Sequence, residues 1–145
     1  MMNIRLQKLR PAAIVPAYQT VGSAGFDMAA CIDTPVVIAP GERAIIPTGL
    51  AIALPPGYEL QIRGRSGLAA KCGVMPANGI GTIDSDYRGE IGVILLNTSH
   101  EKFTVEPEMR VAQGVIARYQ TAEWEVVDTL DETKRGVGGF GSTGA

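Results

Sequence analysis

Two carboxylates, a tyrosine and an arginine lie close together between two apolar runs of the sequence. The segment 79–89 is GIGTIDSDYRG, with Ile83 before the polar cluster and Ile91 after it. Apolar β-branched runs on both sides of an Asp/Ser/Gly cluster predict a β-hairpin. Asp84 would lie where the first strand ends, and a carboxylate held there by a rigid strand could act as a general base. Acids are also ordinary turn formers, so these residues alone leave a purely structural turn open.

The segment 64–67, GRSG, could bind phosphate. Arg65 supplies a guanidinium whose fork of donors suits a phosphate group. Ser66 is expected to cap a short helix, and the flanking glycines allow backbone N–H groups to converge on one point. An ordinary strand-to-helix turn with a solvated arginine fits these residues equally well.

Two shorter segments carry further polar side chains. Asp27 follows an aromatic residue near the start of a predicted strand, where a role in a turn or beside a cation is at least as good as a direct role. Arg110 and Gln113 lie three positions apart, so in a strand their side chains should face opposite ways. One could pair internally while the other faces a ligand, although a surface polar pair is the better interpretation of this segment alone.

The segment 135–144, RGVGGFGSTG, contains five glycines and resembles a phosphate loop in composition. It is not a P-loop, because the residue directly before Ser142 is not a lysine. Its guanidinium, aromatic ring and two hydroxyls suit a phosphate chain attached to a flat base. We expect an arm that orders over a ligand rather than a disordered tail. Ordering costs about 1–2 kcal/mol per residue, which bound phosphates and ring stacking would have to offset.

The composition predicts one globular domain with its own core, since the chain has 145 residues and 46% hydrophobic content. A net charge of −2 gives no reason to expect nucleic-acid or membrane binding. Two cysteines without close spacing and one histidine leave a zinc site without ligands. There is no apolar run of signal-peptide or membrane-span length, so we expect a reducing cytoplasm.

The elements that must position these residues are short strands. Brief apolar runs rich in Val and Ile are separated by Gly and Pro along the chain. The run 58–62, YELQI, alternates apolar and polar residues as a half-buried strand should. Many short strands at close spacing predict an all-β sandwich or barrel, and only residues 68–71 favour a helix.

Taken in order, the five segments resemble the five motifs of the trimeric deoxyuridine triphosphatase (dUTPase) family, from Ala24 to Gly144. The resemblance implies a jelly-roll-type β-sandwich or barrel over residues 1–134, with one short helix and a flexible Gly-rich C-terminal arm over residues 135–145. It implies an enzyme that hydrolyses dUTP to dUMP and pyrophosphate by direct water attack on the α-phosphate. Such an enzyme limits uracil incorporation into DNA and supplies dUMP for thymidylate synthesis. The resemblance further implies Mg²⁺ carried on the triphosphate, and a homotrimer with active sites at the subunit interfaces.

The resemblance also implies roles for individual residues. Asp84 looks like the base that activates water, and Tyr87 like the residue that stacks on the deoxyribose, where a 2′-hydroxyl would clash. The uracil edge would be bound by Asn78 and by the backbone of Gly81, Thr82 and Ile83. The phosphates would be held by Arg65, Ser66, Gly67 and Gln113.

In the C-terminal arm, the terminal phosphates would be clamped by Arg135, Ser142 and Thr143. Phe140, followed by Gly141, would lie over the uracil. Asp27 would order the water shell of the metal, with no direct metal ligand from the protein. Asp86 and Arg110 look structural.

Two positions depart from the family pattern without touching the proposed chemistry. Gly114 stands where a larger aliphatic residue is usual, which should loosen packing or let another backbone approach. Cys72 stands where a histidine is common. The alternatives are a dCTP deaminase-like relative and a non-catalytic nucleotide-binding β-sandwich module. An aspartate rather than a glutamate in the predicted hairpin favours the dUTP branch, and the presence of both Asp84 and the complete arm argues against a binding module.

Overall fold

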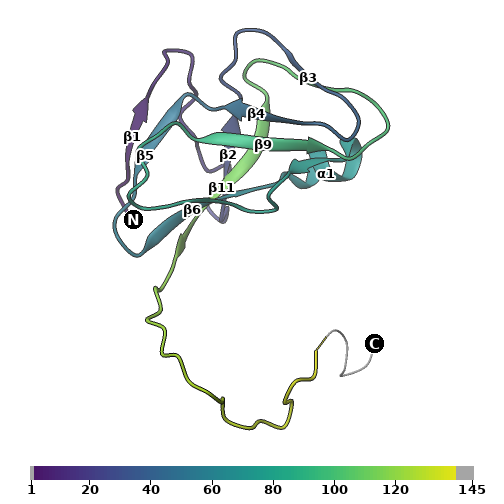
Figure 1. Ribbon diagram of the computed structural model, residues 1–145. Helices are drawn as coiled ribbons and strands as arrows, with labels where there is room; N and C mark the ends of the chain where they lie inside the picture. Colours follow the sequence, from purple (N-terminus) through teal and green to yellow (C-terminus); the bar gives the residue numbers. More distant parts are fainter. Residues whose placement is uncertain (1, 140–145) are drawn as a thin grey trace.

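A computed structural model describes residues 2–139 as short strands with one helix (Figure 1). The elements are β1 (Arg5–Lys8), β2 (Phe26–Ala29), β3 (Val36–Ile38), β4 (Arg43–Pro47), β5 (Leu50–Ala53), β6 (Tyr58–Arg63), α1 (Ser66–Cys72), β7 (Val74–Pro76), β8 (Gly81–Ile83), β9 (Gly92–Asn97), β10 (Phe103–Val105) and β11 (Arg110–Arg118). The predicted all-β fold with one short helix is confirmed. No helix in this part of the chain is long and apolar enough to cross a membrane.

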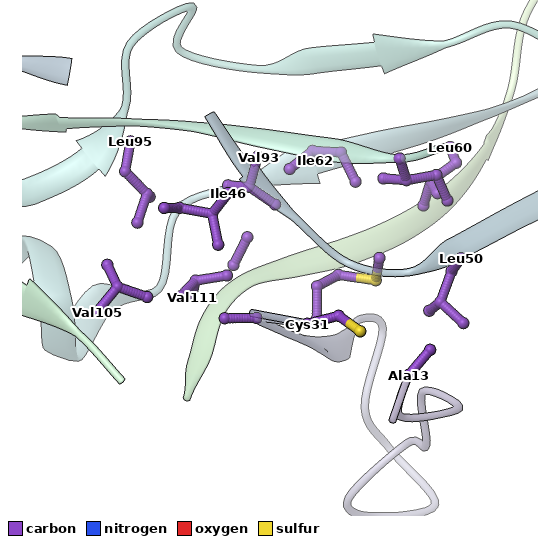
Figure 2. Close-up of a cluster of buried hydrophobic side chains, with 14 of the residues drawn as sticks. Ala13, Cys31, Ile46, Leu50, Leu60, Ile62, Val93, Leu95, Val105 and Val111 are labelled. Carbon is purple, nitrogen blue, oxygen red and sulfur yellow. The ribbon is translucent and has the colours of Figure 1, made fainter. Parts of the chain in front are cut away.

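The strands pair in antiparallel fashion into four sheets. The largest has the order β2-β11-β6-β8, the next β4-β9-β7, and the remaining two are the pairs β1-β5 and β3-β10. Buried side chains of β4, β6, β9 and β11 gather in one cluster, which Figure 2 shows around Ile46, Val93 and Val111. Alternation along β6 buries Leu60 and Ile62, as the sequence predicted.

The predicted hairpin across segment 79–89 is wrong. Strand β8 pairs with β6, whereas β9 pairs with β4 and β7 in a different sheet. The connection 84–91 is longer than the roughly 2–5 residues of a usual hairpin loop. It therefore carries the chain from one sheet to the other, and we call this connection the crossover turn.

The helix differs from its prediction at both ends. Helix α1 covers Ser66–Cys72 rather than residues 68–71. Ser66 is the first helical residue and not the cap, because the extended residue Arg65 takes the N-cap position and makes no side-chain capping bond. Gly73 ends the helix with φ 64°, a left-handed conformation in which its N–H reaches the carbonyls of Leu68 and Ala69.

An aromatic ring explains why position 114 is a glycine rather than the larger aliphatic residue usual in the family. A Cβ built on Gly114 would lie 2.7 Å from Cζ of Phe26 and 2.9 Å from Cδ1 of Leu60. The ring of Phe26 thus occupies the space that a larger residue would need, and Tyr18 meets its edge at a centroid distance of 5.4 Å. The expectation of looser packing is wrong here, and the group that approaches the backbone is a side chain rather than another backbone.

Replacing Gly114 with alanine should lower the free energy of unfolding by about 1–3 kcal/mol, because the added methyl group overpacks against Phe26. Adding Phe26→Leu should recover part of that loss, so the double variant should lose less unfolding free energy than the two single variants lose in sum. Urea unfolding of the four proteins measures this coupling. Gly22→Ala is the control, since its built Cβ meets nothing within 4 Å. Additive effects would contradict the packing explanation.

Candidate active site

One cluster of predicted site residues forms around Asp27, and we call it the phosphate cluster. Its carboxylate contacts Nε of Arg65 at 3.2 Å and Nη1 of Arg110 at 3.0 Å. Nη1 of Arg65 also donates to the carbonyl of Arg110 at 2.9 Å. The cluster joins three segments distant in sequence, namely β2, the end of β6 and the start of β11. Of the roles that the sequence left open for Asp27, the structure therefore supports the one beside a cation.

The phosphate cluster has an excess of positive charge. One carboxylate faces two guanidinium groups, and the Asp27 side chain is only 18% exposed. Arg65 is 29% exposed and Arg110 55% exposed, so the cations are closer to solvent than the anion that holds them. An arginine anchored at one edge is pre-oriented, and it loses less freedom when it binds an anionic group.

Gln113 reaches the same cluster, against the prediction that it and Arg110 face opposite ways. A register shift between Arg110 and Ala112 inserts an extra residue into β11 where it pairs with β2. Val111 and Ala112 are both buried as a result, so the alternation is reset. The amide of Gln113 then donates to the carbonyl of Gly64 at 2.9 Å. Gly25 makes room for it, since a Cβ there would lie 2.9 Å from Oε1 of Gln113.

The loop after Arg65 is open to solvent. Ser66 and Gly67 are exposed at the start of α1, and a Cβ built on Gly67 meets nothing within 4 Å. Gly64, by contrast, packs with its built Cβ 3.1 Å from Cδ of Pro76. The loop thus has a packed side, which fixes its position, and an open side where a ligand could approach.

A second cluster lies in the crossover turn. Asp84 directly follows β8 and is exposed, and its carbonyl accepts a hydrogen bond from the N–H of Tyr87 at 3.2 Å. The Tyr87 hydroxyl donates to the carbonyl of Glu90 at 3.0 Å. Arg88 donates to the carbonyls of Ser85 and Tyr87 at 2.7 and 2.8 Å. Arg88 therefore stabilises the turn itself.

Strand β8 is an edge strand, because the sheet ends there in the order β2-β11-β6-β8. Edge strands present backbone groups on their outer side that have no ladder partner. Gly81 is buried. A Cβ built on Gly81 would lie 3.2 Å from Cβ of Ile62 and 3.3 Å from Nδ2 of Asn78. Asn78, Gly81, Thr82 and Ile83 thus lie together, and their contact with uracil stays a prediction.

The structure does not bring the two clusters together within one chain. Ile83 pairs with Leu60 near the start of β6, so Asp84 lies at that end, while Arg65 follows the other end. The intervening residues of extended chain span roughly 20 Å. Figure 1 shows β6 running between the two regions. The two clusters of candidate site residues therefore lie apart within one chain, and we call them the two candidate half-sites.

The comparisons with known proteins decide the family. The dUTPase family model matches residues 12–144. The chain belongs to the dUTPase family. It is 54% identical over 146 residues to the deoxyuridine 5′-triphosphate nucleotidohydrolase of Orientia tsutsugamushi strain Boryong, with 99% of each chain covered. The family match favours the dUTP branch over both alternatives, the deaminase-like relative and the binding module.

Two solved structures extend the comparison. A variant of the Staphylococcus bacteriophage 80alpha dUTPase with dUpNHpp has a TM-score of 0.90 and 25% identity, with all of both chains covered. This likeness confirms the predicted jelly-roll fold. A variant of the dUTPase from phage phi11 of S. aureus, described with a structural Mg(II) ion, has a TM-score of 0.81 and 22% identity and covers 90% of this chain and 100% of that one.

The C-terminal dUTPase motif lies away from both clusters as far as the structure describes it. Residues 118–137 are all exposed, and Figure 1 shows this segment leaving the sheets after β11. Arg135 donates to the carbonyl of Gly138 at 2.8 Å, a local contact. The predicted contacts at Phe140, Gly141, Ser142 and Thr143 lie outside the described residues.

Sequence reasoning missed the residues that fasten the crossover turn. Glu90 accepts a hydrogen bond from the N–H of Gly49 at 2.7 Å, and Ser85 and Tyr119 share one between their hydroxyls at 3.3 Å. The partners are 41 and 34 positions apart, so no local pattern reveals them. The only available signal was a carboxylate directly after a turn that carries candidate site residues.

Replacing Asp27 with asparagine should lower the free energy of unfolding by about 1–2 kcal/mol, since it leaves two neighbouring guanidinium groups without their shared anion. Asp33→Asn is a matched control. Asp33 pairs with Arg10 alone and is 79% exposed, so its loss should change stability little. Urea unfolding at low and high salt checks both variants. Equal losses in the two would refute the central position given to Asp27.

Proposed function

We propose that the enzyme hydrolyses dUTP to dUMP and pyrophosphate by water attack on the α-phosphate, with Asp84 as the base. The observation that supports this role is the environment of the carboxylate. Asp84 is exposed at the end of a strand, and in residues 2–139 its side chain forms no ion pair. Asp27 and Asp33 are both neutralised by arginines. An unpaired carboxylate on a rigid element can accept a proton from water.

The phosphate cluster supplies the positive charge that phosphoryl transfer needs. In the proposal, Arg65 and Gln113 bind the phosphate chain, together with the hydroxyl of Ser66 and the N–H of Gly67. Support comes from the charge excess at Asp27 and from the open side of the loop at Gly67. Arg110 serves to hold Asp27.

The uracil is proposed to lie along the outer edge of β8. The backbone of Gly81, Thr82 and Ile83 would form hydrogen bonds with its polar edge, and Asn78 would add its amide. The edge position of β8 supports this role, because an extended backbone can read a flat base by alternating donors and acceptors. Tyr87 would stack on the deoxyribose, and its exposure of 44% leaves ring surface available for that contact.

Mg²⁺ is proposed to arrive with the triphosphate. Mg²⁺ in proteins usually keeps several waters and binds through one or two carboxylates plus substrate phosphates. The phosphate cluster fits this arrangement, because its single carboxylate, Asp27, already contacts two arginines and could reach a metal only through water. Bound there, the ion would neutralise charge on the phosphates. In the proposal, Asp27 orients its water shell.

A homotrimer with sites between subunits is proposed because one chain holds two half-sites. Unpartnered apolar surface supports it. Trp124, Val126 and Leu130 are 87%, 97% and 84% exposed on the segment after β11. An apolar cavity of about 540 Å³, lined in part by Leu6 and Ile116, also opens on the body of the protein. Exposed apolar surface of this kind marks protein contacts.

The arm over residues 135–145 is proposed to close on the assembled site. Arg135, Ser142 and Thr143 would bind the terminal phosphates, and Phe140 and Gly141 would cover the uracil. The exposure of residues 118–137 supports a segment that gains its contacts elsewhere. A cytoplasmic location also stays a prediction.

Asp84→Asn should lower kcat by about 10²–10⁴ while leaving KM for dUTP nearly unchanged, because the amide keeps the shape but cannot accept the proton. Asp86→Asn is the matched control and should keep kcat, since Asp86 was predicted to be structural. Pyrophosphate release from dUTP measures both. A parental kcat in the Asp84→Asn variant would exclude the base role.

Two inactive variants should restore activity when they share a trimer. Asp84→Asn and Arg65→Ala subunits, co-expressed with different tags and purified as mixed oligomers, would form intact sites wherever the unmutated Asp84 and Arg65 meet across an interface. Each mixed cyclic trimer should then hold one intact site among its three, roughly a third of the parental activity. A site built within one chain predicts no recovery, because every chain then carries one defect.

A further inference from the structure

We propose that Glu90 is a positioning residue for Tyr87 and thereby sets the preference for deoxyribose over ribose. The inference rests on the proposed stacking of Tyr87 on the sugar. It concerns a residue outside all five motif segments. Three contacts support it, from Tyr87 to Glu90, from Glu90 to Gly49 and from Ile91 to Leu50.

The ring of Tyr87 is fixed by the backbone that follows it. Its hydroxyl donates to the carbonyl of Glu90 at 3.0 Å. One side of the ring lies over Gly89, where a built Cβ would be 2.6 Å from Cζ and 3.0 Å from Cε2 of Tyr87. Any side chain at position 89 would push the ring away. The position of the ring is therefore a direct consequence of where residues 89 and 90 lie.

Glu90 is in turn fixed by its own side chain. Its Oε1 accepts a hydrogen bond from the N–H of Gly49 at 2.7 Å. Gly49 is closely packed, since a Cβ there would lie 2.7 Å from Cβ of Ala13 and 2.7 Å from Sγ of Cys31, and its φ is +68°. The donor that Glu90 engages is thus part of a rigid segment between β4 and β5.

The next residue holds the same peptide group from the other side. The N–H of Ile91 donates to the carbonyl of Leu50 at 2.8 Å, and the hydroxyl of Thr48 donates to the carbonyl of Ile91 at 2.7 Å. The peptide between Glu90 and Ile91 therefore donates to β5 and accepts from Tyr87. Glu90 and Ile91 both precede β9, outside its strand pairing, so this peptide is held by these local contacts, and the carboxylate of Glu90 adds its own contact to Gly49.

The contact needs the reach of Glu90 rather than its charge. Its acceptor role toward a neutral backbone N–H can be filled by an amide oxygen. Arg10, a charged group that interacts with Glu90, forms its ion pair with Asp33 at 2.6 Å. Asp33 is the main cause that raises the pKa of Arg10, and Glu90 adds only a smaller effect. Glutamine should therefore replace Glu90, whereas aspartate, shorter by one methylene, should not reach Gly49.

The test compares kcat/KM for dUTP with kcat/KM for UTP in full-length Glu90→Gln, Glu90→Asp and Glu90→Ala variants. We expect the Gln variant to keep the parental ratio. In the Asp and Ala variants the ratio of the two kcat/KM values should fall roughly tenfold or more, mainly because UTP is turned over faster. A change of this size is expected when a binding pocket becomes less rigid. Thermal unfolding separates this from loss of fold, and the Asp variant covers the case in which the Ala variant fails to fold. Glu106→Ala, at an exposed acid remote from the crossover turn, is the control.

Tyr87→Ala separates the sugar contact from the positioning of the ring. If it lowers the dUTP/UTP ratio while all three Glu90 variants keep it, the positioning role of Glu90 is overturned and the sugar contact of Tyr87 stands. If Tyr87→Ala itself keeps the ratio, the proposed sugar contact fails and the inference fails with it. The proposal would also be overturned if the dUTP/UTP ratio depended on the charge at position 90, so that Glu90→Asp kept the parental ratio and Glu90→Gln lowered it.

Discussion

Strand β6 forms hydrogen bonds with β11 on one side and with β8 on the other, and the position of each candidate half-site depends on this double pairing. The β11 pairing brings Gln113 opposite Arg63 and places the phosphate cluster at the end of β6. The β8 pairing brings Ile83 opposite Leu60 and carries Asp84 to the other end. Because antiparallel neighbours run in opposite directions, a strand that enters beside the end of β6 must leave beside its start. The separation of the proposed base from the proposed phosphate ligands is thus a consequence of the topology.

Asp27 resolves a conflict that this topology creates. Phosphate binding requires several cations in one place, and such cations repel each other before the substrate arrives. A single carboxylate between Arg65 and Arg110 reduces that repulsion and leaves the cluster cationic. The bulge in β11 contributes to the same result, since without the extra residue Arg110 and Gln113 would lie on opposite faces.

Sequence reasoning predicted what depends on local periodicity and missed what depends on distant partners. The alternation of 58–62 identified the buried face of β6, because side-chain direction in a strand is a local property. The hairpin failed because an apolar run shows which face is buried but not which strand will pair with it. The bulge was missed although the adjacent apolar residues Val111 and Ala112 are its signature. The fit of Phe26 to Gly114 joins residues that no spacing relates.

The division of the candidate site also has an electrostatic benefit within the proposed mechanism. A carboxylate placed beside Arg65 in the same chain would pair with it, as Asp27 does, and a paired carboxylate is a poor base. At roughly 20 Å, Asp84 lies beyond the screening length of about 8–10 Å at ordinary ionic strength, so it is too far from Arg65 and Arg110 of its own chain to pair with them. Assembly would then bring Asp84 to a phosphate cluster on another chain. There the charge of the triphosphate, rather than that of the base, would face the guanidinium groups. The same separation that makes one chain incomplete would keep its base available.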